Sequence, residues 1–337
     1  MDKWYEKSGQ NVGTAVSTRI KISRNIKGYP FPNKMNSEQQ RAVNKTVYAA
    51  LFESGELDEN ELQWIEMSAL SDSQAAALAE RGVVSGEFIC DRANKVLLLS
   101  KDESISIALG DEDHITLRVM GVGLCLDALG RIAEKYDNII CSNLAIAFDE
   151  HLGFLTACPT KLGTALTCSV LLHLPALKSG SEVRHMAQSV SRIGLDIHPY
   201  SDLSDNTDSA FYLLSNRITL GISESTAKGN LDAIARQLIR REEQLRTEIN
   251  PLYIEDAVFR ALALLKSARK IDAAELERLL SDLRLGISQG IVDNIPLEVP
   301  FSLMQNTKPN TIVSGFGEQT ADDVDCLRAQ ITREALS

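Results

Sequence analysis

Two cations alternate along one short segment near the start of the chain. Residues 17–25 read Ser-Thr-Arg-Ile-Lys-Ile-Ser-Arg-Asn, so Arg19, Lys21 and Ser23 stand two residues apart. Because side chains alternate between the faces of a β-strand, this spacing puts both cations on one face. Such a pair could clamp an anion, and arginine forks match the phosphate oxygens handled in phosphoryl transfer. The alternative is an exposed strand whose charges are simply solvated.

A second group of ionisable residues is the run Gly-Asp-Glu-Asp-His at 110–114, which directly follows an apolar segment. Clustered carboxylates can raise one another's pKa, and one of them can then serve as a general base. The alternatives are a charged β-turn and, for His114, a hydrogen-bonded structural role.

A third candidate is Cys158, which opens the run Cys-Pro-Thr-Lys-Leu-Gly-Thr before the apolar segment 169–174. A loop of this composition could present a thiol and backbone amides to a substrate. A buried, inert cysteine is the alternative, because packing is the commoner role of such residues.

The common glycine-rich phosphate loops are absent from the sequence. It contains neither a Walker A motif nor a complete Gly-x-Gly-x-x-Gly, so a bound nucleotide would have to be held by arginines projecting from strands. The six cysteines include no Cys-x-x-Cys pair, and no histidine stands at metal-ligand spacing. We therefore expect no protein-bound metal and reduced thiols.

Composition indicates a globular, cytoplasmic protein. The 337 residues are 44% hydrophobic, and 46 acidic against 35 basic residues give a net charge of −11. This balance argues against nonspecific binding to nucleic acid or to an anionic membrane. No apolar run reaches the roughly 18 residues of a membrane span, and the first residues do not resemble a signal peptide.

The elements that must position these residues follow from hydrophobic periodicity. Residues 1–36 read as an extended arm with a short basic strand, and a capping box at Ser37–Gln40 opens a helix over 37–54. The further helices are expected at 123–136, 181–190, 225–247, 255–267 and 272–285. The strands are expected at 96–99, 104–108, 115–119, 154–157, 165–174 and 211–220.

These elements predict an α+β fold, an antiparallel β-sheet flanked by helices, because no regular βαβ rhythm is present. The pattern turns mostly helical after residue 250 and is punctuated there by prolines. We expect a catalytic domain over 1–250 and a helical C-terminal domain over 251–337, which would serve dimerisation or partner binding.

Four segments, in this order, resemble the phosphagen kinase (ATP:guanido phosphotransferase) superfamily, and most closely its bacterial protein-arginine kinases of the McsB type. The family's "SSRVRLARN" resembles 17–25, "NEEDHIR" resembles 110–116, "CPTNLGTGLRASVMLHLP" resembles 158–175 and "ISNQITLG" resembles 214–221. The likeness continues through 283–287 and 328–329. It therefore covers nearly the whole chain.

The resemblance implies a reaction, a site and partners. Such enzymes transfer the γ-phosphoryl group of Mg-ATP to a guanidinium nitrogen, here of a protein arginine. Glu112 matches the carboxylate that orients the guanidinium, and Cys158 matches a cysteine near it. The residues assigned to the nucleotide are Arg19, Lys21, His114, Arg118 and His173, the last on the adenine side. The implied partners are a zinc-binding activator protein, the Clp chaperone–protease system and a second copy of the chain.

The chain departs from this family where phosphate is held. Lys21 replaces the second arginine of the first motif, and Thr116 and Thr167 replace two more, although Arg118 could partly compensate for Thr116. In the family's mobile loop a fourth arginine corresponds to His198 and a substrate glutamate to Leu203.

A further departure concerns the pocket that binds phosphoarginine in the family, where the Arg-Asp pair reads Val324-Asp325 before Arg328-Ala329. Together these departures favour a pseudokinase with a degenerate ATP-phosphate site, acting as a regulatory or interaction protein in protein quality control. The alternatives are an active protein-arginine kinase with a rearranged site and, with less support, a kinase of small guanidines.

Overall fold

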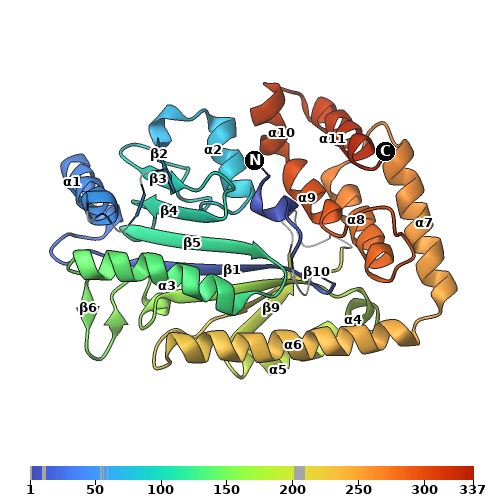
Figure 1. The fold of residues 1–337 in the computed structure, drawn as a ribbon, viewed down its shortest axis with the longest axis horizontal. Coiled ribbons are helices and arrows are strands. Elements are labelled where there is room, and N and C mark those ends of the chain that lie inside the picture. Colours follow the sequence, from blue (N-terminus) through green and yellow to red (C-terminus); the bar gives the residue numbers. More distant parts are fainter. Residues whose placement is uncertain (1, 10–12, 54, 56, 59, 201–208) are drawn as a thin grey trace.

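An eight-stranded antiparallel sheet forms the centre of the molecule, in the order β2-β3-β4-β5-β1-β8-β10-β9 (Figure 1). The computed structural model describes residues 2–9, 13–53, 55, 57–58, 60–200 and 209–337. The strands are β1 (Ala15–Arg24), β2 (Gln63–Glu66), β3 (Val96–Leu99), β4 (Ile105–Leu109), β5 (Ile115–Val122), β8 (Leu166–His173), β9 (Leu195–Pro199) and β10 (Phe211–Asn216). A small hairpin, β6 (Phe148–Asp149) and β7 (Gly153–Phe154), lies beside the sheet. The predicted α+β class is confirmed.

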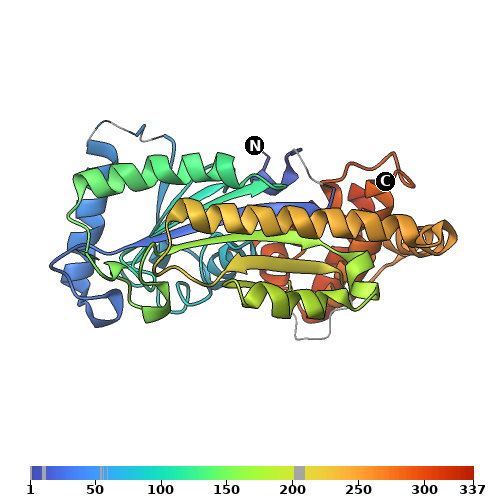
Figure 2. The same ribbon diagram turned by 90° about the horizontal axis from the view of Figure 1, so that it is seen from below.

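Helices cover both faces of the sheet. They are α1 (Ser37–Tyr48), α2 (Asp72–Glu80), α3 (Leu126–Asn143), α4 (Pro175–Ser179), α5 (Glu182–Ser191), α6 (Glu224–Glu248), α7 (Pro251–Ser267), α8 (Ala273–Ser288), α9 (Val299–Asn306), α10 (Pro309–Phe316) and α11 (Ala321–Ala335). Figure 2 shows the long α6 running along the sheet with α3 beside it. Within the described residues, no helix has the length and apolar character needed to span a membrane.

Strand β1 is longer and more central than the sequence predicted. Instead of a short strand in an arm, ten residues pair with β5 on one side and β8 on the other. Ile20 and Ile22 explain this, because both are buried in the apolar core beneath α3 and α6. Arg19 and Lys21 point to the opposite face and are only partly exposed. The alternative of an exposed, solvated strand is therefore wrong.

The first long helix begins at Ser37, as predicted, but it is capped by a different residue and ends at Tyr48, where a π-helical turn over Ala49–Glu53 follows. Asn36 is the N-cap, its side chain accepting a hydrogen bond from the Gln39 amide (2.9 Å) while the Gln39 side chain accepts one from the Asn36 amide (3.0 Å). The capping box is therefore Asn36–Gln39 and not Ser37–Gln40. Asparagine caps at least as well as serine, so neighbouring candidates are hard to rank from sequence.

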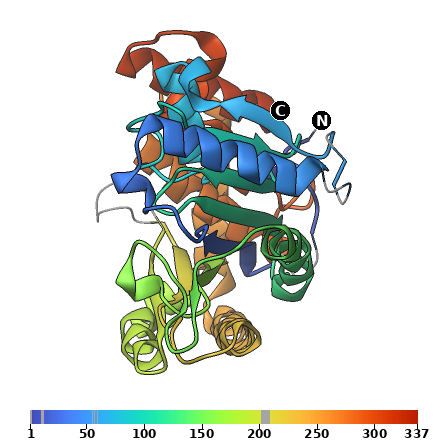
Figure 3. The same cartoon turned by 90° about the vertical axis from the view of Figure 1, so that its left-hand side faces the viewer.

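The C-terminal helices pack on the sheet face that carries Arg19 and Lys21. One apolar cluster contains both sheet residues, such as Leu171 and Phe211, and residues of the C-terminal helices, such as Leu283 and Phe301. In Figure 3 the red helices α10 and α11 lie at the top, while α5 and α6 lie at the bottom. The division at residue 250 falls between α6 and α7 and stays a prediction.

Candidate functional site

Three cations meet on this second face of the sheet. Lys21 on β1 is in register with Arg118 on β5, and on its other side with Thr167 on β8. Arg19 lies two residues before Lys21 on the same face. We call Arg19, Lys21 and Arg118 the cation cluster. The sequence singled out all three residues, and the structure brings them together.

The cation cluster contains hydrogen-bond donors that are not used. Nη2 of Arg19 and Nη1 of Arg118 are buried and have no hydrogen-bond partner among the described residues. An unsatisfied buried donor is costly, and for a charged group the cost is larger. Two such donors on neighbouring strands fit an anion, whose oxygens would accept from both guanidinium groups.

Arg19 is held in place by a glycine. A Cβ atom at Gly82 would lie 2.4 Å from Nη1 of Arg19, so the guanidinium packs directly on the glycine backbone. Gly82 also has a φ of +75°, a conformation that side chains with a Cβ rarely adopt. The turn after α2 therefore shapes one wall of the candidate anion site.

Asp111 partly neutralises the cation cluster. Its carboxylate accepts from Nη2 of Arg118 (3.0 Å) and from Oγ of Ser85 (2.7 Å). Burial tends to raise the pKa of Asp111, but the Arg118 charge and these hydrogen bonds hold the pKa below its usual 3.8. One side of the Arg118 fork is thus already engaged by the protein.

Lys21 is half-buried among charges of both signs. Burial first, and then the charges of Arg118 and Lys161, lower its pKa from the ordinary value of 10.5, and the nearby carboxylates of Asp111 and Glu112 offset this only in part. A bound anion would offset both effects, because it neutralises the neighbouring charges and ion-pairs with the ammonium. The electrostatics of Lys21 therefore also favour an anionic ligand.

Glu112 lies beside the cation cluster and forms an ion pair with Lys161. Both side chains remain partly exposed, at 31% for Glu112 and 29% for Lys161. Lys161 ends the short 3₁₀ helix Pro159–Lys161, which Cys158 immediately precedes. The structure thus brings Glu112 next to the cysteine loop, as the family resemblance implies.

The cysteine loop is fixed by the acidic run. Oδ1 of Asp113 accepts from the amide of Ala157 (2.8 Å) and from Nδ2 of Asn25 (2.7 Å), which joins the loop to the end of β1. Sγ of Cys158 lies 3.0 Å from Oγ1 of Thr160 and is partly exposed. The thiol is therefore not buried packing, the alternative considered from the sequence.

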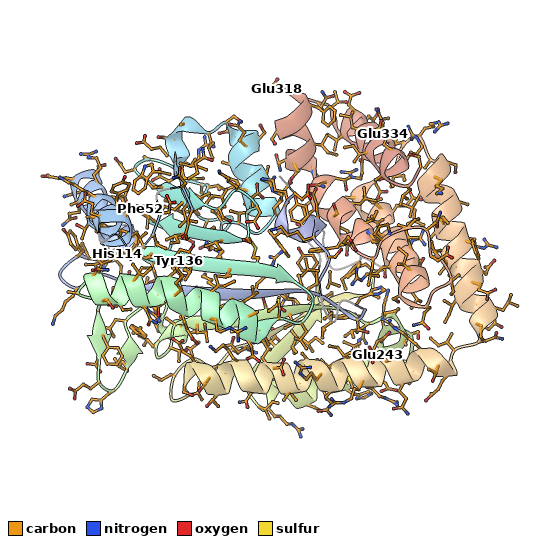
Figure 4. All side chains as sticks on the ribbon, viewed as in Figure 1. Phe52, His114, Tyr136, Glu243, Glu318 and Glu334 are labelled. Atoms are coloured by element: carbon orange, nitrogen blue, oxygen red, sulfur yellow. The ribbon has the colours of Figure 1, made fainter. Side chains whose placement is uncertain are left out.

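His114 fills a structural position. Its Nδ1 accepts from the amide of Ile26 (2.9 Å), so Nε2 carries the proton and donates to the carbonyl of Pro30 (2.7 Å). The side chain is fully buried, and burial lowers its pKa from 6.5. Figure 4 labels it near the start of β5, at the opposite end of the molecule from the C-terminal helices. As placed here, it offers no surface to a nucleotide.

His173 is likewise enclosed. Nε2 lies 2.9 Å from Oγ of Ser281 on α8, and the ring packs against Phe211 with 4.9 Å between ring centroids. Burial, and then the charges of Arg246 and Arg284, hold its pKa well below 6.5, so the imidazole is neutral. The residue joins β8 to the C-terminal helices and does not line an open adenine cleft.

The positions at which the resemblance implied further arginines are occupied by side chains without a permanent positive charge. Thr116 is buried and pairs with Ser23, and Thr167 lies directly beside Lys21. His198 is on the edge strand β9, where Nδ1 lies 3.4 Å from the carboxylate of Asp196. Leu203 lies outside the described residues.

Sequence reasoning missed three features of this site. It did not predict the Arg118–Asp111 pair, the packing of Arg19 on Gly82, or the role of Lys161 as partner of Glu112. Of these, Lys161 left a visible signal, because it stands where the family motif has asparagine.

Among the described residues, no group of three His, Cys, Asp or Glu side chains could hold a metal ion.

Arg328 lines a separate cavity of about 460 Å³ between α2 and the C-terminal helices. Its guanidinium donates to the carbonyls of Thr307 (3.1 Å) and Ile271 (3.0 Å) and pairs with Asp325 (2.5 Å). The side chain is 2% exposed. These contacts use Arg328 to join α11 to its neighbours.

Two family models match the chain. Residues 42–245 match the C-terminal catalytic domain of the ATP:guanido phosphotransferases, and residues 251–337 match the C-terminal domain of the protein-arginine kinase McsB. The protein-arginine kinase of Brevibacillus brevis is 34% identical, over 99% of this chain and 94% of its own length. That of Clostridium kluyveri is 33% identical, over 100% and 99%.

Solved structures agree on the fold. A lombricine kinase superposes with a TM-score of 0.60 at 20% identity, covering 73% of this chain and 72% of its own. The duplicated taurocyamine kinase of Schistosoma mansoni, determined with bound components of a transition state analog, gives 0.60 at 21% identity. That match covers 80% of this chain and 40% of the duplicated one.

Proposed function

The chain belongs to the ATP:guanido phosphotransferase family, in its protein-arginine kinase branch, and we propose that it is a member that has lost phosphoryl transfer. In this proposal it acts as a regulatory or interaction protein in protein quality control. Its partners are the proteins that the resemblance implies, a zinc-binding activator and the Clp chaperone–protease system.

The observation that carries the proposal is the small number of positive side chains on the sheet face that holds the cation cluster. Arg19, Lys21 and Arg118 are the cations of the cluster, and Asp111 engages one side of Arg118. Thr116 and Thr167 add none. Phosphoryl transfer is catalysed mainly by positioning and by positive charge, and one missing contact of this type commonly costs about 10²-fold in rate. Several missing contacts would reduce turnover to a residual level.

The remaining residues still suit an anionic ligand. The unused donors of Arg19 and Arg118 would bind phosphate oxygens, and magnesium would enter bound to those oxygens, since it prefers them to an all-protein site. Glu112 would hold a guanidinium ion by a charge-assisted hydrogen bond. Binding of Mg-ATP or Mg-ADP is therefore part of the proposal.

The same unused donors favour a second candidate, an active protein-arginine kinase with a rearranged site. In that case Arg118 would replace the arginine missing at Thr116, and Lys21 would supply charge without the bidentate fork. Glu112 would orient the arginine, and Cys158 would lie near the reacting nitrogen.

Mass spectrometry of phosphoarginine separates the two candidates. The purified chain is incubated with Mg-ATP and a mixture of bacterial proteins, and the Glu112→Gln variant provides the blank. The proposal predicts equal phosphoarginine in both samples, together with a thermal shift on adding Mg-ADP. Phosphoarginine that forms only with Glu112 intact would establish the active kinase instead.

A further inference from the structure

Lys161 is built into the loop that faces Glu112. Its amide donates to the carbonyl of Cys158 (3.0 Å), and Oγ1 of Thr219 donates to the carbonyls on either side, Thr160 (3.2 Å) and Leu162 (2.7 Å). The backbone of Lys161 is therefore anchored from two directions. The lysine approaches Glu112 from a fixed base and not from a long free loop.

The ammonium of Lys161 occupies the position on Glu112 where a substrate cation would bind. Glu112 accepts from Nζ of Lys161, and no other hydrogen bond to its carboxylate occurs among the described residues. Burial tends to lower the pKa of Lys161, but Glu112 more than offsets this and raises the pKa above 10.5. The ammonium thus stays charged at any physiological pH.

We infer that Lys161 is an internal competitor for the guanidinium site, because its ammonium must leave the Glu112 carboxylate before an arginine side chain can bind there. This inference rests on the proposed role of Glu112. A tethered group competes at an effective concentration of about millimolar or more, so even a modest ion pair weakens a free ligand substantially. Asparagine, the residue in the family motif, carries no charge and could not compete in this way.

The competition also affects the cation cluster. Lys161 lowers the pKa of Lys21, so the two charges repel each other at short range. An arginine bound to Glu112 would place its own charge in the same location. Lys161 therefore reproduces the charge of a bound substrate in the absence of one.

Calorimetric titration with N-acetyl-L-arginine amide, whose only charge is its guanidinium, tests the inference without nucleotide. Lys161→Asn is expected to bind this probe about tenfold more tightly than the natural chain, while Lys161→Arg should not gain affinity. The gain should disappear in the double variant Lys161→Asn, Glu112→Gln. Lys135→Asn is the matched control, because Lys135 pairs with Glu61 on an exposed surface.

Equal or weaker binding by Lys161→Asn, including no binding by either protein, would overturn the inference. Lys161→Met, which keeps most of the side-chain length, serves as a second variant if Lys161→Asn does not fold. The outcome is independent of catalysis. Phosphoarginine formation by the natural chain would contradict the proposed loss of activity, whereas an unchanged affinity contradicts only the role of Lys161.

Discussion

At the scale of single residues, the proposed loss of activity rests on the charges of the side chains that face the candidate anion site. Lys21 keeps a positive charge but loses the planar fork, and Thr167 beside it has neither. The two positions share one strand register, so their side chains face the same volume. The loss at one position is therefore not made up by the other.

Restoring one arginine should strengthen nucleotide binding. Thr167→Arg would place a guanidinium next to Lys21 on the partly exposed β8 face, and we expect Mg-ADP to bind about tenfold more tightly. The measurement is isothermal titration, with Thr167→Gln as an uncharged control. Equal affinities for the natural chain and both variants would mean that the phosphates bind elsewhere.

The burial of His173 should make the free energy of unfolding depend on pH. Its pKa lies well below 6.5 in the folded chain, so the unfolded chain binds an extra proton once the pH falls below about 6.5. The free energy of unfolding should then decrease on acidification, by up to about 1.4 kcal/mol per pH unit from this residue.

Urea unfolding at pH 7.5, 6.0 and 5.0 measures this contribution. His173→Gln retains a hydrogen-bonding group for Ser281 but cannot be protonated, so its stability should fall less steeply than that of the natural chain. If the free energy of unfolding fell equally with pH in the two proteins, His173 would accept a proton as readily in the folded chain as in the unfolded chain. The comparison between proteins removes the contribution of carboxylates, which both share.

At the scale of elements, β1 decides whether the cation cluster forms. Arg24, at its end, is 1% exposed and pairs with Asp137 of α3 (2.6 Å) and Glu224 of α6 (3.3 Å). Its guanidinium also lies 3.5 Å from the ring centroid of Phe154. One arginine thus ties β1 to both helices beneath the sheet.

Arg24→Met should destabilise the fold by about 3–5 kcal/mol, because two carboxylates lose their buried partner. Chemical denaturation followed by circular dichroism would measure the change. Arg236→Met is the control, since Arg236 pairs with Asp232 on an exposed helix face and should shift the midpoint little. A similar small shift for both variants would contradict the anchoring role of Arg24.

The sequence predicted elements better than it predicted their neighbours. The strands over 96–119 and the helices over 225–285 have strong periodicity, and the structure contains them with small shifts at their ends. The sequence could not show that residues 15–24 form a central strand. That strand pairs with β5 and β8, which lie about 100 and 150 residues further along the chain. The short elements β2, α2 and β9 carried too few residues for a periodic signal.

The same limit applies to the site. The spacing of Arg19 and Lys21 was enough to place them on one face, and the family motif drew attention to Glu112 and Cys158. The contact of Arg19 with Gly82 is not encoded in any local pattern, because it needs the turn after α2 to reach β1. His114 ends the acidic run and His173 alternates with apolar residues, and neither pattern shows that tertiary packing encloses both side chains.

At the scale of the whole molecule, the C-terminal helices complete the core of the sheet. Leu171 and Phe211 of the sheet share an apolar cluster with Leu283 and Phe301. Glu80 of α2 also accepts from the backbone amides of residues 310 and 311 at the start of α10, at 3.0 Å each. The two parts of the chain are therefore joined by a common core and by hydrogen bonds.

A chain truncated after residue 250 should accordingly fail to fold cooperatively, because the sheet would expose the apolar face that the helices cover. Thermal unfolding and size-exclusion chromatography of residues 1–250 would test this. A monomeric fragment with a sharp transition would instead support a self-sufficient catalytic domain. The full chain measured under the same conditions is the control.

The central claim is that too few positive side chains surround the nucleotide phosphates for transfer to occur. A crystal structure of the chain with Mg-ADP tests it most directly. We predict phosphate contacts from Arg19, Lys21 and Arg118, with Asp111 still bound to Arg118. No other positive side chain should reach the phosphates at the places that arginines at positions 116 and 167 would fill. Guanidinium groups from other parts of the chain filling those places would contradict the account and restore an active kinase.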